Sequence, residues 1–454
     1  MYEYYFHVTS QVSSSPPKQE YAYLFVKRIM NSKSNTETTT SIRSHDKYGD
    51  ELSTLLGRLR PFQREAFDFA TCGGILKERT EENGIAKSGH FDSKKGIGAG
   101  RLLLADEMGL GKTVTSLAIM LAYKSEWPLL ILCPASLRYT WPAEIEKFIP
   151  SLSFSEIYVV NGFDDSDFYS NPIKRSRIKV VIATYSLLQN RSAAAQVLRQ
   201  FNFQCVIADE SHNLKEKTSQ RCQLAMPLLM NAKRLILLSG TPALARPVEL
   251  WPQLHCIDQD LFGSYTSFTK TYCNARRGRF GWDVKGLSNA SELHSKLKTI
   301  MIRRLKADVL SDLPSKQRSI VPVKIQGKYI RECRDLIEEM NRNKEVRMSL
   351  EGGSNDAVFE ARSLLMQAYQ ASGIGKAQSV AEYVLDWLRG SGSQKLLVFA
   401  HHTEVLNIIE SAVSKHLKGV GHIRIDGSVP PAQRAARYVS VHSFCSQQCN
   451  NSLL

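Results

Sequence analysis

Residues 102–113 read LLLADEMGLGKT, and this stretch decides the fold class. The leucines predict a buried strand, and the Gly-Lys-Thr after them is typical of a phosphate-binding loop that leads into a helix. Gly109 and Gly111 let the backbone approach a phosphate closely, and N–H groups at a helix start favour the anion. Lys112 is expected to reach the β- and γ-phosphates, and the Thr113 hydroxyl to help hold Mg²⁺. The stretch therefore predicts an ATP site.

Asp106 is also expected to take part in nucleotide binding, but it makes the match imperfect, because it stands where the pattern G-x-x-x-x-G-K-[ST] has its first glycine. A second motif strengthens the prediction. Residues 205–208 (CVIA) predict another strand, which runs directly into Asp209 and Glu210. An Asp at a strand end binds Mg²⁺, and the adjacent Glu orients or deprotonates the attacking water. The alternative is an exposed Asp-Glu pair that caps a helix, but two such motifs at the ends of two strands favour the ATP site.

Short apolar runs alternate with helical patterns between residues 101 and 238, which is typical of an α/β fold with a parallel sheet buried on both faces. The strands are expected at residues 102–104, 129–133, 157–160, 180–183, 205–208 and 235–238. A helix is expected after Pro61. Further along, residues 395–400 and 422–425 predict strands, and 404–417 a helix between them.

Two turns follow predicted strands at the edge where α/β sheets bind ligands. Ser239, Gly240 and Thr241 form the first, and a simple strand-to-helix turn is its alternative. Ser136 and Arg138 lie in the second, where they are candidates for contact with a phosphate backbone. A helix N-cap with a surface arginine explains that turn equally well.

The composition favours an anionic partner. The formal net charge is +15, which points first to nucleic acid, although a solvated basic surface explains it as well. Two basic clusters stand out, 276–280 (RRGRF, beside an aromatic) and 303–306 (RRLK). Nucleic-acid contact is plausible for both, but solvated faces explain such runs more often. The nine scattered cysteines indicate reduced thiols in an intracellular compartment.

The chain is expected to hold several parts. Residues 1–50 predict a disordered or loosely ordered tail, and 51–260 a nucleotide-binding lobe with a polar insertion near 77–100. Residues 261–394 are mainly helical by pattern, and 395–454 begin a second α/β unit.

The order of the motifs resembles one family, the SWI/SNF-like helicase-related ATPases of superfamily two. Within it the chain is similar to the annealing-helicase subgroup, HARP-like and nearest to its zinc-finger Ran-binding-domain branch. The resemblance rests on the following segments: 59–63, 106–113, 134–138, 209–212, 237–250, 272–275, 301–313, 397–402 and 424–428.

The resemblance implies a P-loop NTPase fold with two RecA-like lobes, here a complete first lobe and an incomplete second one. It implies that Gln63 contacts adenine, that Lys112 binds phosphates, and that Asp209 and Glu210 serve magnesium and water. Residues 239–241 would couple hydrolysis to motion. The cofactors would be ATP and Mg²⁺, and the activity ATP-dependent translocation on DNA. Members of the subgroup rewind DNA and remodel forked DNA in replication and repair in the nucleus.

The resemblance fails after residues 424–428, where the family continues to an arginine-finger motif that this sequence does not show. Such an arginine is worth about 10³–10⁵ in rate, so slow hydrolysis is expected. An alternative function follows, a catalytically impaired ATP- and DNA-binding fragment with a regulatory role or no independent one. An RNA helicase is a distant third, because residues 301–313 resemble the DNA-translocating branch.

Overall fold

The computed structural model describes residues 47–72, 100–160, 176–189, 192–242, 246–278, 281–310, 318–349, 355–390, 396–430, 433, 434 and 437. The described residues form two compact units. The first unit comprises the described residues from 47 to 310 together with 430, 433, 434 and 437, and the second comprises those from 318 to 429. Most of the predicted tail and insertion lies outside the described residues. Among those described, no helix is long and apolar enough to cross a membrane.

A seven-stranded sheet forms the centre of the first unit, in the order β3-β4-β2-β5-β6-β1-β9. Every neighbouring pair is parallel. The strands are β1 (Arg101–Leu104), β2 (Leu129–Cys133), β3 (Ile157–Val159), β4 (Val180–Thr184), β5 (Cys205–Ala208), β6 (Arg234–Leu238) and β9 (Met301–Ile302). The parallel sheet of the predicted α/β fold is confirmed, and six of its strands lie where the apolar runs placed them.

The seventh strand, β9, was not predicted. It is only two residues long and pairs with β1, Leu103 opposite Met301 and Leu104 opposite Ile302. A strand of that length carries no sequence period, so only the folded chain reveals it. Its position matters, because it brings the residues after Ile302 next to the loop that follows β1.

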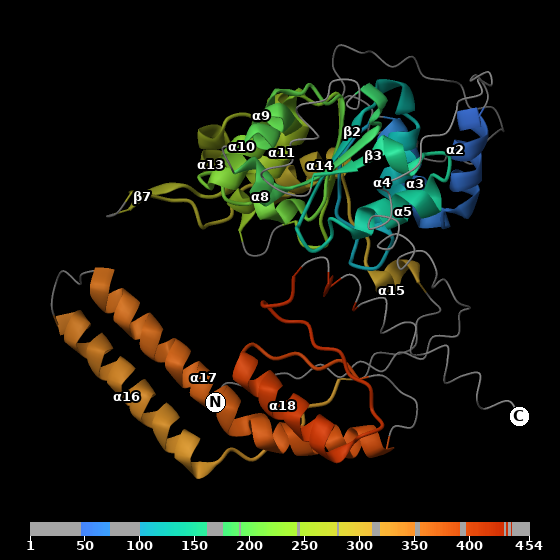
Figure 1. The fold of residues 1–454 in the computed structure, drawn as a ribbon. Coiled ribbons are helices and arrows are strands. Elements are labelled where there is room, and N and C mark those ends of the chain that lie inside the picture. The colour runs from blue at the N-terminus through green and yellow to red at the C-terminus, as the bar shows by residue number, and fades with distance from the viewer. Residues whose placement is uncertain are drawn as a thin grey trace, which may run out of the picture. The chain divides into compact units, whose positions relative to one another are not determined.

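Both faces of the sheet are buried, as continuous apolar strands require. Along β1, Leu103 belongs to one core cluster, while Leu102 and Leu104 belong to the other. Figure 1 shows the helices on opposite sides of the strands. The cluster with Leu102 is covered by α2 (Lys47–Arg58), α3 (Pro61–Thr71), α4 (Lys112–Leu121) and α5 (Thr140–Phe148). The helix predicted after Pro61 is confirmed.

The opposite face is covered by helices from later in the chain, which share the core cluster of Leu103. These helices are α8 (Tyr185–Leu188), α9 (Ala193–Gln200), α10 (Gln220–Asn231), α11 (Trp251–Ile257), α12 (Gln259–Phe262), α13 (Tyr265–Tyr272) and α14 (Ala290–Ile300). The first unit also contains an antiparallel pair, β7 (Arg276–Gly278) and β8 (Gly281–Asp283), and the short helix α15 (Lys306–Val309). Its 3₁₀ turns are η1 (Lys124–Glu126), η2 (Phe154–Glu156), η3 (Ser211–Leu214) and η4 (Pro247–Leu250).

The regular secondary structure in the described part of the second unit is helical. It consists of α16 (Gly327–Ser349), α17 (Asn355–Gly390) and α18 (Thr403–His416), and α17 and α18 share an apolar core with Val380 and Ile409. The helix expected at residues 404–417 is therefore confirmed.

The strands expected at residues 395–400 and 422–425 are wrong for the described positions 396–400 and 422–425, which form no β-ladder. Leu397 and Phe399 are exposed rather than buried. A strand needs a hydrogen-bonded neighbour, and the described part of the second unit supplies no other strand. An apolar run shows that a segment can be a buried strand, but not that its partner is present.

Candidate active site

The loop between β1 and α4 has the geometry of a phosphate cradle. Gly109 and Gly111 both adopt the left-handed backbone region, with φ of 85° and 79°. A Cβ placed on Gly111 would lie only 2.4 Å from Nε2 of Gln63, so both conformation and space require glycine there. Lys112 and Thr113 follow in the first turn of α4. The helix thus begins at the loop, with its unpaired N–H groups at that end.

Gln63 supports this loop from α3. Its Nε2 donates to the Leu110 carbonyl at 2.9 Å, and its Oε1 accepts from the backbone N–H of Arg60 at 2.9 Å. The side chain is buried, so both ends of its amide are engaged by the protein. The resemblance predicts an adenine contact for Gln63. The structure adds a second task, since the same amide fixes the backbone just before Gly111.

Lys112 turns back onto its own loop. Its ammonium group donates to the Asp106 carbonyl at 2.9 Å and to the Glu107 carbonyl at 3.4 Å. Burial lowers the pKa of Lys112, and the carboxylates of Glu210 and Asp106 oppose that shift. Phosphate oxygens would be stronger partners for this cation than neutral carbonyls. The loop therefore fits a polyphosphate.

Asp106, the residue that breaks the glycine pattern, has a partner that the sequence did not reveal. Its Oδ1 accepts from the backbone N–H and Nε of Arg304 at 3.1 and 3.0 Å, and its Oδ2 accepts from the second guanidinium nitrogen at 2.8 Å. Asp106 is only 2 % exposed. A third guanidinium contact joins Arg304 to the Phe62 carbonyl. A fork-shaped, charge-assisted pair thus holds the start of the loop.

The segment after β9, residues 303–306, runs along the loop and is called the clamp segment below. The Glu107 N–H donates to the Arg304 carbonyl at 2.9 Å, and the Lys306 N–H donates to Glu107 Oε2 at 2.7 Å. Arg303 donates to the carbonyls of Ala105 and Gly240 at 3.4 and 3.3 Å. From the sequence, residues 303–306 are a basic cluster within the 301–313 family motif, and no contact with the loop after β1 is predicted for them. Here their contacts hold the phosphate loop in place.

Asp209 lies at the end of β5, and hydrogen bonds fix both of its carboxylate oxygens. Oδ2 accepts from the Trp141 indole at 3.0 Å, and Oδ1 accepts from the Glu210 N–H at 2.9 Å. Its carbonyl accepts from the Tyr185 hydroxyl at 2.8 Å. Burial raises the pKa of Asp209 to about 6, although the bond from Trp141 works in the opposite direction. A buried carboxylate with a raised pKa fits a divalent cation, which would stabilise its charged form.

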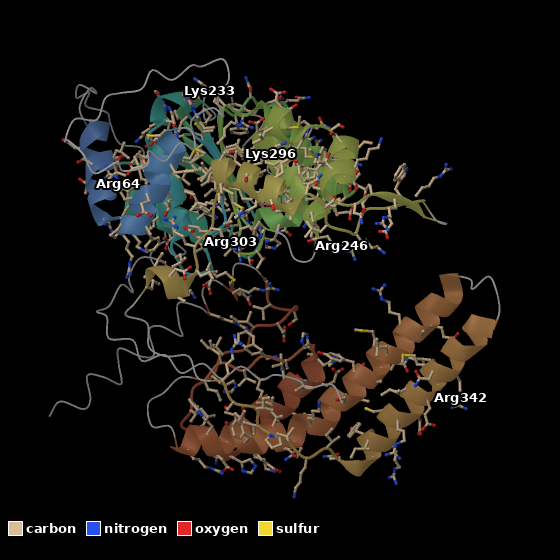
Figure 2. All side chains as sticks on the ribbon, turned by 180° about the vertical axis from the view of Figure 1, so that it is seen from behind. Arg64, Lys233, Arg246, Lys296, Arg303 and Arg342 are labelled. Carbon is tan, nitrogen blue, oxygen red and sulfur yellow. The ribbon has the colours of Figure 1, made fainter. Side chains whose placement is uncertain are left out.

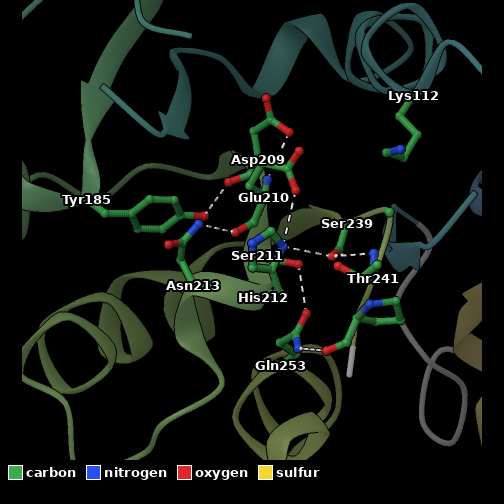
Figure 3. Close-up of polar contacts among 12 residues, drawn as sticks. Lys112, Tyr185, Asp209, Glu210, Ser211, His212, Asn213, Ser239, Thr241 and Gln253 are labelled. Carbon is green, nitrogen blue, oxygen red and sulfur yellow. Dashed lines mark hydrogen bonds and ion pairs between the residues drawn. The ribbon is translucent and has the colours of Figure 1, made fainter. Parts of the chain in front are cut away.

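Glu210 is held in a strained backbone conformation, with φ of 49°. Its carbonyl accepts from the N–H and the side-chain amide of Asn213, at 3.0 and 2.8 Å. Its carboxylate lies 3.1 Å from Nδ1 of His212. Left-handed conformations of residues other than glycine cost about 1–3 kcal/mol and cluster at functional sites. The turn therefore places the Glu210 carboxylate at the end of β5, on the side where Lys112 lies (Figure 3).

The Ser239–Thr241 turn contacts both motifs. His212 Nδ1 lies 3.2 Å from the Ser239 hydroxyl, which also accepts from the Thr241 N–H at 3.2 Å. A Cβ on Gly240 would lie 2.8 Å from Met108, so the turn packs directly against the phosphate loop. The turn thus lies against both motifs, and its role in coupling hydrolysis to motion stays a prediction.

Gln253 is a residue that sequence analysis missed. It lies fully buried in α11, where its Oε1 accepts from the Ser211 hydroxyl at 2.8 Å and its Nε2 donates to the Pro242 carbonyl at 2.8 Å (Figure 3). One amide thus joins the Asp209–His212 turn to the Ser239–Thr241 turn. No motif marks it, since a lone glutamine in a helix is ordinarily a surface residue.

Replacing Gln253 by Met is expected to lower the free energy of unfolding by about 2 kcal/mol. The volume is nearly kept, but a buried hydroxyl and a buried carbonyl lose their partner, and each unsatisfied group costs about 1–3 kcal/mol. Urea unfolding of the purified chain measures the change. Gln259→Met, at an exposed position of α12, is the matched control. Equal stability of the two variants would contradict the bridging role.

Asp209 gives a prediction for pH. Its folded pKa of about 6 lies above the ordinary 3.8, so the folded chain holds the proton more tightly than the unfolded one. The bound proton therefore contributes to the free energy of unfolding. This contribution is fully present below about pH 4 and is lost as the pH rises through 6, a decrease on the order of 2–3 kcal/mol. Asp209→Asn is expected to lack this loss. Urea unfolding at several pH values, with Asp260→Asn as an exposed control, measures it. Parallel curves for wild type and Asp209→Asn would contradict the assignment.

The candidate DNA residues lie in the turn after β2. Ser136 is exposed. Arg138 donates to the Val160 carbonyl at 3.3 Å and to the Tyr139 hydroxyl at 3.0 Å, and its guanidinium lies 4.8 Å from the Tyr139 ring centre. These contacts orient Arg138 within the protein, and its contact with DNA remains a prediction.

Comparison with known proteins identifies the same fold family. The family model described as the SNF2-related domain matches residues 82–371. The cattle protein named DNA annealing helicase and endonuclease ZRANB3 is 37 % identical over 90 % of this chain and 34 % of its own length. Its mouse counterpart is 41 % identical over 74 % of this chain and 30 % of its own length.

A second group of relatives is similar at the same level. The Xenopus laevis SWI/SNF-related matrix-associated actin-dependent regulator of chromatin subfamily A-like protein 1 is 38 % identical over 84 % of this chain and 35 % of its own length. The chain thus spans about a third of the length of the curated relatives it matches. The solved Sulfolobus solfataricus SWI2/SNF2 ATPase core with double-stranded DNA aligns at 20 % identity and a TM-score of 0.43, covering 79 % of this chain and 70 % of that one.

Proposed function

Because this chain belongs to the SNF2-related family, we propose that it is an ATP-dependent DNA translocase of the annealing type. It would rewind or remodel forked DNA during replication and repair, in the nucleus. One observation carries the proposal. Lys112, from the loop after β1, and the Asp209–Glu210 pair, from the turn after β5, lie on the same edge of the sheet (Figure 3), where the carboxylates of Glu210 and Asp209 act to raise the pKa of Lys112.

Each of these residues would have a separate role in ATP hydrolysis. Backbone N–H groups of the loop and Lys112 would bind the phosphates, and Thr113 with Asp209 would hold Mg²⁺. Glu210 would orient or deprotonate the attacking water. Mg²⁺-bound ATP would supply the phosphoanhydride bond whose cleavage drives motion. The turn formed by Ser239, Gly240 and Thr241 would couple ATP hydrolysis to motion, because this turn contacts both motifs.

DNA is the partner that two independent observations support. The chain carries a formal net charge of +15, and phosphate contacts by Lys and Arg supply most of non-specific DNA affinity. Relatives that align with most of this chain are named DNA annealing helicases. Forked DNA or a single-strand/duplex junction is the form that annealing activity requires, because rewinding acts where the strands separate.

A rewinding assay tests the proposal. One strand of a partly unwound duplex carries a fluorophore, and the other carries a quencher. The purified chain is expected to quench the fluorescence with Mg²⁺-ATP and not with a non-hydrolysable analogue. Absence of rewinding by a folded chain whose ATP hydrolysis responds to DNA would exclude annealing and leave a DNA-dependent ATPase.

A further inference from the structure

The β7–β8 ribbon is an arm that leaves the body of the first unit. Strands Arg276–Gly278 and Gly281–Asp283 pair only with each other, and all six residues are exposed. Two opposite views show that the arm extends outward from the helices of the first unit (Figures 1 and 2). A two-stranded ribbon of this length is not stable by itself, so the protein must hold it from its base.

The base of the arm is tied firmly to α13. The Ser288 N–H donates to the Tyr272 carbonyl at 2.9 Å, and the Ser288 hydroxyl donates to the Thr271 carbonyl at 2.7 Å. Across the base, the Asn274 N–H donates to the Ser288 hydroxyl at 3.0 Å. Tyr272 itself is part of the apolar core. The arm is thus anchored in the core at one end and presented to solvent at the other.

One face of the arm pairs an aromatic ring with a cation. Arg277 and Trp282 are directly opposite in the register, so their side chains share a face. Trp282 is 62 % exposed, and it is the exposed one among the five tryptophans of the chain. A large exposed ring on an anchored support is available for contact with a partner, and tryptophan is enriched at such interfaces.

Charge decides what kind of partner fits. The described arm and its base carry Arg276, Arg277 and Lys285 against a single acid, Asp283. Exposed aromatic rings beside cations are the chemistry that binds unpaired bases and the adjoining phosphates. An acidic, apolar peptide would contact the same face, but the stacking geometry of an indole favours a base.

We propose that the Arg277–Trp282 face of the β7–β8 arm binds DNA where paired and unpaired strands meet. The indole stacks on an unpaired base, and the guanidinium contacts a neighbouring phosphate. The inference rests on the proposed function, since it assumes a DNA substrate. The inference goes beyond the proposed function because it names the element that recognises the junction and discriminates between a junction and a plain duplex.

Two variants of Trp282 separate stacking from mere apolar contact. Trp282→Leu keeps an apolar side chain but removes the ring, and is expected to weaken binding of the full chain to forked DNA by about tenfold. Trp282→Phe keeps a ring and is expected to stay within about threefold of wild type. Both are expected to bind blunt duplex as wild type does. Fluorescence anisotropy with labelled fork and duplex DNA measures all of these affinities.

Tryptophan fluorescence supplies a readout that misfolding would not mimic. Forked DNA is expected to quench the emission of wild type and to protect it from acrylamide, whereas Trp282→Phe loses both effects. Equal fork affinity for wild type and Trp282→Leu, with no quenching, would overturn the role of the arm. Failure of the wild-type chain to bind any DNA would overturn the proposed function itself, so the two failures are distinguishable.

Discussion

Replacing Lys112 by Ala is expected to lower the rate of ATP hydrolysis by about 10²–10³-fold, the range found when one charge-stabilising donor leaves an active site. We propose that this ammonium group binds phosphate, and the carboxylates of Glu210, Asp106 and Asp209 act to raise its pKa. Among the described residues, it donates to the neutral carbonyls of Asp106 and Glu107. Its removal should therefore affect nucleotide handling far more than folding.

Two measurements check this expectation. Titration with a fluorescent ATP analogue reports binding, and phosphate release reports turnover. Lys298→Ala removes the same charge from an exposed position of α14 and should leave both unchanged. Unchanged nucleotide affinity and turnover in Lys112→Ala would show that the loop between β1 and α4 is not the nucleotide site.

Replacing Arg304 by Met is expected to destabilise the first unit by about 3–5 kcal/mol, because it leaves a buried charge without its partner. Met keeps the apolar stem and the bond from the backbone N–H, while Asp106, 2 % exposed, loses two of its three hydrogen bonds from Arg304. The two lost bonds come from the guanidinium and carry the charge. The clamp segment would then release the start of the phosphate loop.

A double-mutant cycle isolates this pair. Asp106→Asn in the Arg304→Met background removes the stranded charge, so the double variant is expected to be more stable than Arg304→Met alone. Urea unfolding of the four chains gives the coupling free energy. Additive losses would contradict a direct pairing of the two side chains. The nucleotide affinity of the same variants shows whether the clamp segment also affects nucleotide binding by the loop.

Local patterns were enough to place the centre of the fold and the candidate site. Each predicted strand of the first unit is a continuous apolar run, and burial on both faces of a parallel sheet requires that pattern. The phosphate loop and the Asp209–Glu210 pair follow β1 and β5, so their meeting at one edge follows from the parallel arrangement. Residues whose role depends on neighbours in the sequence were predictable.

The residues that hold the site together were not predictable in this way. Asp106 and Arg304 are 198 positions apart, and Ser211 and Gln253 are 42 apart. Neither contact has a local signal, because each depends on how distant elements pack. The sequence marks Asp106 as a departure from the glycine pattern within the predicted nucleotide-binding loop, and its buried ion pair with Arg304 explains why an acid is tolerated there.

In the second unit, a local pattern predicted a strand that the structure does not form. Residues 395–400 have the apolar pattern of a buried strand, yet Leu397 and Phe399 are exposed and the described part forms no ladder. Strand formation depends on hydrogen bonds to another strand, and a pattern within one segment does not contain that information.

Steady-state ATP hydrolysis by the purified, folded chain, with and without forked DNA, tests the central claim most directly. The site geometry and the family predict hydrolysis that requires Mg²⁺, rises when forked DNA is added, and disappears in Lys112→Ala. Hydrolysis that is absent, or unchanged by DNA, in a chain shown to be folded and to bind both ATP and DNA would contradict the claim that this chain is a DNA-driven ATPase.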